Sequence, residues 1–287
     1  MRLILFSLLL LPLACSSNKS EQSKASSESP EIFDEATLTD EREIKFSYGI
    51  EPQQFGFLTV PDSAGPHPVI VLIHGGFWTA NFGLDLMQPL AEDLSEQGYA
   101  TWNIEYRRVG DLNGGFPGTL IDVAAAIDYL DEVSAEYKLD TNQVVVVGHS
   151  SGGHLALWSG SRTKLAENSP GANPLINPKV VVGQAAVTNL IDAAEAGLGG
   201  NATQAFLGGE PEDVPQTYKI AQPIIGSTET ILVTGSEDSI VPVTQTTQYK
   251  DLAKIIVVEG EDHFTVIDPA SQSWSNLVNE LNTILQK

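Results

Sequence analysis

One serine stands where a strongly apolar run changes abruptly into a helix-forming segment. Residues 144–147 are four valines, residues 148–154 read GHSSGGH, and the helix-forming letters LALW follow. A side chain on Gly148 or Gly152 would collide with the neighbouring strand or helix in a sharp turn, so the glycines favour such a turn. The pattern predicts a strand–turn–helix unit, a nucleophile elbow, that presents the Ser150 hydroxyl at the edge of a sheet. The alternative is a purely structural glycine-serine turn.

Strand and helix patterns alternate along most of the chain. Continuous apolar runs are typical of strands covered on both faces. Alternation with amphipathic segments predicts an α/β fold with a mostly parallel central sheet and helices on both faces. Residues 189–227, rich in glycine and proline, are expected to be irregular and to overhang the site. The expected strands are residues 44–48, 55–60, 69–73, 100–104, 144–147, 180–182, 231–234 and 255–258, and the expected helices are residues 84–97, 120–137 and 274–285.

A serine hydroxyl is a weak nucleophile at neutral pH, so it needs a base and a carboxylate that orients the base. In a fold of this kind the acid and then the histidine follow the serine, each in a loop after a strand. His263 lies late in the chain, just beyond a predicted strand. Asp238 follows another predicted strand and would be the acid, and its neighbour Glu237 is the alternative. Asp262 is disfavoured because an immediate neighbour rarely points its carboxylate at the same ring.

Acyl transfer also needs hydrogen-bond donors for the oxyanion that develops on the substrate. Residues 74–78 read HGGFW and follow a predicted buried strand, so their backbone N–H groups could approach a ligand closely. The expected donors are the amides of Gly76, Phe77 and Ser151, the residue after the nucleophile. A glycine turn without this role is the alternative. The aromatic side chains that could wall an apolar substrate pocket, or simply pack in the core, are Phe77, Trp78 and Phe82.

Three further histidines lie close to these motifs. His74 begins the HGGFW segment and is expected to brace it by hydrogen bonds. His149 and His154 flank the elbow. For these two, core packing or support of the site is expected rather than catalysis.

Together these motifs resemble the α/β-hydrolase superfamily, in particular esterases with an HGG-type oxyanion loop, including kynurenine formamidase-like and feruloyl-esterase-like enzymes. The resemblance extends from about residue 45 to the C-terminus. It implies the α/β-hydrolase fold and a triad of Ser150, Asp238 and His263. Phe77 departs from the pattern, because the longer HGGG form has a third glycine there. The matching segments are HGGFW at 74–78, EYRR at 105–108, in which Arg107 and Arg108 are expected to form structural ion pairs, GHSSGGH at 148–154, Asp238 with Val241-Pro242, and His263-Phe264.

The resemblance implies a serine hydrolase that cleaves carboxylic esters of small or medium substrates through an acyl-enzyme. Such an enzyme needs no organic cofactor and no metal, and the sequence has no evident metal-ligand cluster. One alternative keeps the triad but cleaves an amide, as an N-formyl aryl amide hydrolase does. A peptidase ranks lower, because the chain lacks room for the large gating domain of related peptidases. The remaining alternative is a surface lipoprotein that uses the scaffold only for binding.

The charge balance argues against nucleic acid as a partner. The chain has 15 Lys+Arg and 37 Asp+Glu, a formal net charge of -22. Binding to phosphate backbones depends on clustered cations, which such a composition opposes. The expected partner is therefore a small-molecule ester or amide substrate.

The N-terminus predicts export. Residues 3–11 are apolar but too short to span a membrane, and Cys15, the only cysteine, follows shortly after. This arrangement resembles a bacterial lipoprotein processing site, with residues 1–14 as signal peptide and Cys15 carrying lipid; ordinary signal cleavage nearby is the alternative. The polar composition of residues 15–40 predicts a disordered tether before a catalytic domain over residues 41–287. Ser16, rather than aspartate, resembles the pattern sent to the outer membrane, which predicts an outer-membrane or periplasmic location in a Gram-negative cell.

The lipid-anchor hypothesis predicts the behaviour of one variant. Cys15→Ala removes the sulfur to which lipid would be attached, so it should move the protein from the membrane fraction to the soluble fraction after cell lysis and ultracentrifugation. Ser16→Ala is the matched control and should stay with membranes. Retention of Cys15→Ala in the membrane fraction would contradict the hypothesis.

Overall fold

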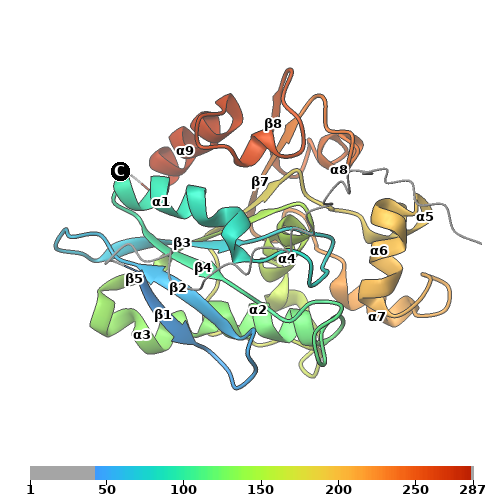
Figure 1. Ribbon diagram of the computed structural model, residues 1–287, viewed down its shortest axis with the longest axis horizontal. Coiled ribbons are helices and arrows are strands. Elements are labelled where there is room, and N and C mark those ends of the chain that lie inside the picture. The colour runs from blue at the N-terminus through green and yellow to red at the C-terminus, as the bar shows by residue number, and fades with distance from the viewer. Residues whose placement is uncertain (1–42, 286–287) are drawn as a thin grey trace, which may run out of the picture. The chain divides into compact units, whose positions relative to one another are not determined.

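The computed structural model describes residues 43–285 (Figure 1), so the predicted signal peptide, Cys15 and the tether lie outside the described residues. The described strands form one eight-stranded sheet in the order β1-β2-β4-β3-β5-β6-β7-β8. All neighbours from β4 through β8 run parallel, whereas β2 is antiparallel to both β1 and β4. The predicted mostly parallel sheet is thus confirmed. The strands are β1 (Glu43–Ser47), β2 (Phe55–Thr59), β3 (His67–Ile73), β4 (Ala100–Ile104), β5 (Leu139–His149), β6 (Val180–Gln184), β7 (Glu229–Gly235) and β8 (Lys254–Val258).

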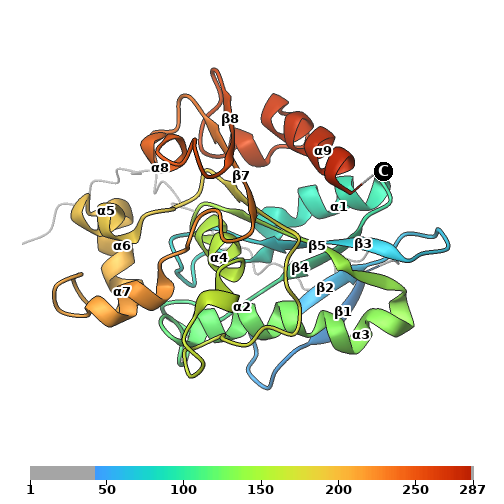
Figure 2. The ribbon, with the colours of Figure 1, turned by 180° about the vertical axis from the view of Figure 1, so that it is seen from behind.

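Helices cover both faces of the sheet, as predicted. In Figures 1 and 2, α1 and α9 lie on one face, and α2 and α3 lie on the other. The predicted helix over residues 120–137 is two helices, α2 and α3, that meet at Tyr129. The described helices are α1 (Gln88–Glu96), α2 (Gly118–Asp128), α3 (Leu130–Tyr137), α4 (Ser151–Ser159), α5 (Leu190–Glu195), α6 (Leu198–Leu207), α7 (Pro215–Ala221), α8 (Thr244–Thr247) and α9 (Gln272–Ile284).

The apolar runs of the central strands are buried on both faces of the sheet. Along β3, Val69 and Val71 pack in the core layer with α2, α3 and α4, whereas Ile70 and Leu72 pack in the layer with α1 and α9. The valines of residues 144–147 alternate between the same two layers. This two-residue alternation follows from the pleat of a strand. Burial on both faces therefore explains why residues 69–73 and 144–147 are unbroken apolar runs in the sequence.

The expectation that residues 189–227 are irregular is wrong for most of the segment, because it contains α5, α6 and α7, although residues 199–201 at the start of α6 have positive φ. The Asn189 side chain accepts hydrogen bonds from the amides of Ile191 and Asp192, which starts α5. Gly208, with φ 87°, ends α6 in the left-handed conformation. These caps define short helices within a glycine-rich composition. Figures 1 and 2 show the three helices gathered at one end of the sheet.

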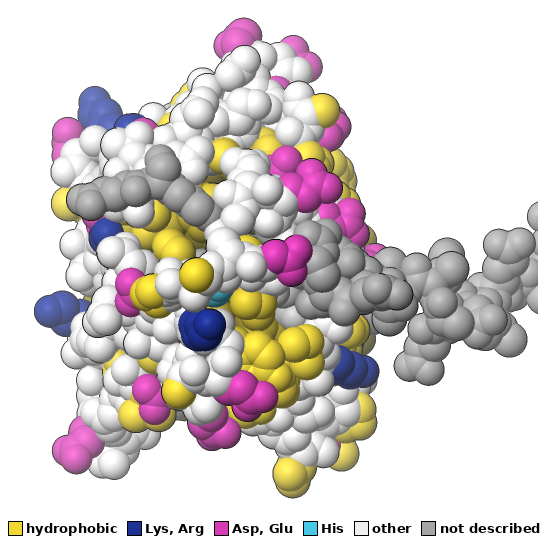
Figure 3. All heavy atoms as spheres, turned by 90° about the vertical axis from the view of Figure 1, so that its left-hand side faces the viewer, with side chains coloured by type: hydrophobic (Ala, Val, Ile, Leu, Met, Phe, Trp, Pro, Cys, Tyr) yellow, Lys and Arg dark blue, Asp and Glu magenta, His cyan; other side chains and the backbone are white. Residues whose placement is uncertain are grey.

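The surface in Figure 3 carries acidic side chains that are dispersed rather than collected in one field, with a few basic side chains between them. Hydrophobic side chains gather in several patches on the same face. Among residues 43–285, no helix combines the length and the apolar character that crossing a membrane would require.

A buried histidine connects α4 to α7. His154 is fully buried, and its Nε2 lies 2.9 Å from the carbonyl oxygen of Ala221, at the end of α7. Its Nδ1 accepts a hydrogen bond of 3.2 Å from the indole N–H of Trp78. Both ring nitrogens therefore have a partner in the neutral imidazole. Burial lowers the pKa of His154 to about 4, since the charged ring would lose its hydration.

This burial predicts acid destabilisation. The unfolded chain binds a proton at His154 below its usual pKa of 6.5, whereas the folded protein does so only near 4. Between these pH values the unfolded state binds more protons, so the free energy of unfolding falls as pH falls, by up to about 1.4 kcal/mol per pH unit for this group. We expect His154→Phe to reduce that slope in urea denaturation from pH 6.5 to 4. An unchanged slope would show that His154 is not held neutral.

Candidate active site

The predicted elbow is present between β5 and α4. β5 ends at His149, α4 begins at Ser151, and Ser150 between them has φ 56° and ψ -119°. This conformation is strained for a residue with a side chain. It is held by hydrogen bonding, since the Ser150 amide donates to the Gln184 carbonyl on β6 at 2.8 Å.

The glycines of the elbow permit a close approach of backbone to backbone. A Cβ atom on Gly152 would lie 2.2 Å from the carbonyl oxygens of both Ile73 and His74. A Cβ atom on Gly148 would lie 2.1 Å from the Gly152 carbonyl oxygen. The first turn of α4 can therefore contact the end of β3 only if these positions lack side chains.

The structure brings Asp238 and His263 together. His263 Nδ1 lies 2.8 Å from Asp238 Oδ2, and both side chains are buried. The other carboxylate oxygen of Asp238 accepts hydrogen bonds from the amides of Ile240 and Val241. The carboxylate is thus fixed on one side by its own loop and receives the histidine N–H on the other. In the neutral ring this leaves Nε2 of His263 without a proton, as a general base requires.

The other two carboxylates considered as partners of His263, those of Glu237 and Asp262, do not contact its ring. Glu237 is exposed. Asp262 is also exposed, and its Oδ1 accepts hydrogen bonds from the amides of Phe264 and Thr265 and from the Thr265 hydroxyl. These bonds lower the pKa of Asp262. Asp238 is the carboxylate of the three that contacts the His263 ring.

Ser150 and His263 line the same small cavity, of about 40 Å³. Two of the predicted oxyanion residues, Gly76 and Phe77, line it as well, as does the predicted pocket residue Phe82. Most of its other lining residues are apolar. Sequence reasoning did not assign Leu86, Ile240 or Phe264 to a pocket, although Phe264 directly follows the predicted base. The complete lining is Gly76, Phe77, Phe82, Leu86, His149, Ser150, Ile240, His263 and Phe264.

The HGGFW segment forms a tight turn beside the elbow. The Thr79 amide donates to the Gly76 carbonyl at 3.0 Å, and Phe77 and Trp78 between them have φ values of 55° and 57°. The Trp78 amide donates to the Ser151 hydroxyl at 3.2 Å, so it is engaged within the protein. Ser151 begins α4, where the first N–H groups have no acceptor inside the helix. This arrangement leaves the amides of Gly76, Phe77 and Ser151 as the candidate oxyanion donors.

The expectation that Trp78 walls the substrate pocket is wrong. Its side chain is fully buried, stacks on Phe206 with ring centroids 4.8 Å apart, and does not line the cavity. The left-handed turn directs the indole into the core instead. Phe82, in contrast, is 43% exposed at the cavity. The Phe77 ring also lies close to α6, because a Cβ atom on Gly199 would be 2.5 Å from the ring.

His74 braces the turn, as expected. It is fully buried and stacks on Tyr106 with ring centroids 4.4 Å apart. Its Nδ1 lies 2.7 Å from the Gly75 carbonyl oxygen, and its Nε2 lies 3.0 Å from Glu105 Oε1. Glu105 also accepts the amides of Tyr106 and Leu84 and pairs with Arg108. One buried carboxylate therefore joins the oxyanion turn to the segment after β4.

The expected structural ion pairs of the EYRR segment are present. Arg107 binds the fully buried Asp122 of α2 through Nε at 2.8 Å and Nη2 at 2.6 Å. Gln54 donates to the same carboxylate at 2.7 Å. Sequence reasoning did not identify Asp122 as this partner, because helical spacing alone gives no sign that an acidic residue faces the core.

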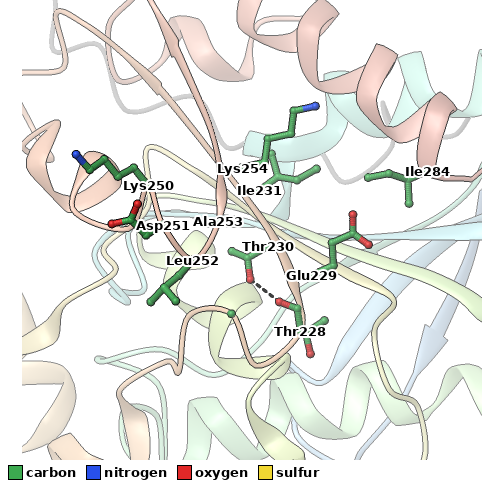
Figure 4. A pocket seen from close by; sticks show the side chains of 11 residues that line it. Thr228, Glu229, Thr230, Ile231, Lys250, Asp251, Leu252, Ala253, Lys254 and Ile284 are labelled. Carbon is green, nitrogen blue, oxygen red and sulfur yellow. Dashed lines mark hydrogen bonds between the residues drawn. The ribbon is translucent and has the colours of Figure 1, made fainter.

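A larger cavity lies away from these residues. It has about 410 Å³ and is lined by the first residues of β7 and β8 and the residues just before them, together with Ile284 (Figure 4). Its Lys254 forms an ion pair with Glu280, and its Thr230 hydroxyl donates to the Thr228 carbonyl at 2.7 Å. None of the predicted site residues within residues 43–285 lines it. Within residues 43–285 there is also no cluster of His, Cys, Asp and Glu suited to a metal ion.

The curated relatives include ester hydrolases and also fungal polyketide synthases, which match only about a third of this chain. A probable carboxylic ester hydrolase, LipM, of Mycobacterium tuberculosis is 28% identical over 220 residues, which is 71% of this chain and 50% of that protein. The chain spans about half the length of the curated relatives it matches.

Solved structures show the same fold. A truncated carbohydrate esterase from gut microbiota has a TM-score of 0.71 at 20% identity, covering 87% of this chain and 99% of that one. Esterase B of Lactobacillus rhamnosis has a TM-score of 0.71 at 19% identity, covering 86% of each chain. The fold is therefore the α/β-hydrolase fold, as predicted. The BD-FAE family model matches residues 58–252, most of the chain, and we conclude that this protein belongs to the BD-FAE family.

Proposed function

We propose that this protein is a serine esterase that cleaves carboxylic esters of small or medium substrates through an acyl-enzyme. The observation that carries the proposal is the 2.8 Å hydrogen bond between His263 and Asp238, with His263 lining the same cavity as the strained Ser150. The names of the relatives, which include a carboxylic ester hydrolase and an esterase, support ester cleavage.

In the proposed mechanism, Ser150 Oγ attacks the ester carbonyl carbon while His263 Nε2 accepts the hydroxyl proton. Asp238 holds the ring in the required tautomer and stabilises the imidazolium. His263 then donates its proton to the leaving alkoxide, and the acyl group remains on Ser150. A water molecule, deprotonated by His263, then attacks the acyl carbon. The bond between that carbon and Ser150 Oγ breaks, His263 returns the proton to Oγ, and the carboxylic acid leaves.

The oxyanion of each tetrahedral intermediate would be bound by the amides of Gly76, Phe77 and Ser151. A single donor of this kind typically contributes about 2.7 to 4 kcal/mol to the lowering of the barrier. The turn is held in place by two hydrogen bonds, from the Thr79 amide to the Gly76 carbonyl and from the Trp78 amide to the Ser151 hydroxyl. Donors fixed in this way need no reorganisation during the reaction.

The cavity supports a preference for short, uncharged acyl groups. Its volume of about 40 Å³ has room for only a few non-hydrogen atoms, and among residues 43–285 no lysine or arginine lines it to bind a carboxylate. Phe82 and Phe264, 43% and 50% exposed, leave an apolar surface at the cavity for part of the alcohol. The carbohydrate esterase among the structural neighbours makes acetylated sugars reasonable substrates to test.

The location of the enzyme forms part of the proposal. We infer from residues 1–40 of the sequence that it is exported and anchored to a membrane through lipid on Cys15. The polar residues that follow would hold the catalytic domain away from the membrane surface. Soluble small esters would then reach the site from the extracytoplasmic side.

A panel of p-nitrophenyl esters tests the activity. The acetate should give a higher kcat/KM than the octanoate, and Ser150→Ala should abolish turnover of both. Asp238→Asn should lower kcat by about 10⁴-fold, because the amide favours the wrong histidine tautomer. Glu237→Gln is the matched control and should keep wild-type kcat, since Glu237 is exposed.

Three other outcomes would overturn the proposal. Formanilides cleaved with a higher kcat/KM than esters of similar size would assign the triad to amide hydrolysis. A folded wild-type protein whose Ser150 does not react with a fluorophosphonate probe, as judged by peptide mass spectrometry, would indicate a binding protein. Equal ester hydrolysis by wild type and Ser150→Ala would remove Ser150 from the mechanism.

A further inference from the structure

His149 connects the strand of the nucleophile to the loop of the base. Its ring is 1% exposed, and its Nε2 lies 2.9 Å from the carbonyl oxygen of His263. A carbonyl oxygen can only accept, so Nε2 of His149 carries the hydrogen and donates. The two imidazole rings also lie against each other, with centroids 4.7 Å apart and an interplanar angle of 51°.

This hydrogen bond joins the ends of two strands that are not neighbours in the sheet. His149 ends β5, and His263 follows β8, with β6 and β7 between these strands. The Asp238 carboxylate holds the side chain of His263, whereas His149 holds its main chain. The base is therefore fixed at two points, and the second point belongs to the residue directly before Ser150. A displacement of the base relative to the nucleophile would stretch this bond.

The charge state of His149 suits such a role. Burial lowers the pKa of His149 to about 3, so the ring is neutral at neutral pH. A neutral ring does not repel the positive charge that would form on His263 during the reaction. Its Nδ1 is buried and has no hydrogen-bond partner among the described residues. The titratable groups that act on this pair of rings are Asp238, His74 and Asp262.

We propose that His149 is a positioning residue that sets the distance and orientation of the His263 ring relative to Ser150. The inference rests on the proposed function of the triad. His149 also lines the cavity, and its hydrogen bond acts on the base through the His263 main chain. Loss of its N–H donor should affect the chemical step more than substrate binding.

Three variants separate this role from simple packing. His149→Phe keeps an aromatic ring but has no donor, and it should lower kcat about 10- to 100-fold, as small misplacements of catalytic groups do, with little change in KM. His149→Gln keeps an N–H donor near the position of Nε2 and should recover most of the lost rate. His154→Phe, which removes another buried histidine donor, is the matched control.

The pH profile of kcat/KM provides a readout that packing alone would not move. Its acid limb reports the protonation of the base in the free enzyme. We expect His149→Phe to shift the midpoint of this limb, and we expect His149→Gln and His154→Phe to keep the wild-type midpoint. In proton NMR, the chemical shift of the His263 Nδ1–H should change in His149→Phe and stay at the wild-type value in His149→Gln and His154→Phe. Urea denaturation measures any loss of stability separately.

Several outcomes would overturn the inference. A folded His149→Phe with wild-type kcat and acid limb would do so, and so would an equal shift of the limb in His154→Phe. If His149→Phe lowered only the stability, with kcat and the pH profile unchanged, the role of His149 would be packing alone.

The rate of fluorophosphonate labelling at Ser150 distinguishes failure of the proposed triad from failure of the positioning role. Unreactive wild type refutes the triad, whereas reactive wild type with an equally reactive His149→Phe refutes only the positioning role.

Discussion

The contact between the first turn of α4 and the end of β3 is the constraint on which the site depends. Gly152 lies so close to the carbonyl groups of Ile73 and His74 that a Cβ atom would be 2.2 Å from each oxygen. The oxyanion turn starts at these same carbonyl groups, so this approach fixes Ser150 beside Gly76. A wider separation would leave the nucleophile without its neighbouring amides. The strain at Ser150 persists because the surrounding backbone is held on both sides.

Buried polar groups then fix the loops that the sheet leaves free. Glu105 binds His74 on one side and backbone amides on the other, and Asp122 is bound by Arg107 and Gln54. A carboxylate removed from water is tolerated only when such partners replace its hydration. Each carboxylate joins segments that are far apart in sequence. The oxyanion turn is thereby supported by β4 and its following loop as well as by its own hydrogen bonds.

Much of this arrangement could be predicted from the sequence, because local patterns carry it. The four valines of residues 144–147 and the glycines around Ser150 define strand and turn without reference to the rest of the chain. The identity of the acid could not be decided locally, since Glu237 and Asp238 are neighbours and only the three-dimensional path of the loop directs one of them to His263.

The direction of the Trp78 side chain could not be predicted from the sequence either. A left-handed turn at Phe77 and Trp78 is not expected of aromatic residues, and it sends the indole into the core. Helices α5 to α7 were missed because their caps rely on single residues such as Asn189 within a composition typical of loops.

The contact between α6 and the oxyanion turn has a consequence for how such sequences can vary. A Cβ atom on Gly199 would lie 2.5 Å from the Phe77 ring, so residue 199 must be small while residue 77 is aromatic. A glycine or other small residue at position 77 would remove this steric restriction, although the φ of 60° at residue 199 still favours glycine there. Among relatives that keep this geometry, the two positions should therefore covary, with large residues at 199 appearing only where the ring at 77 is lost.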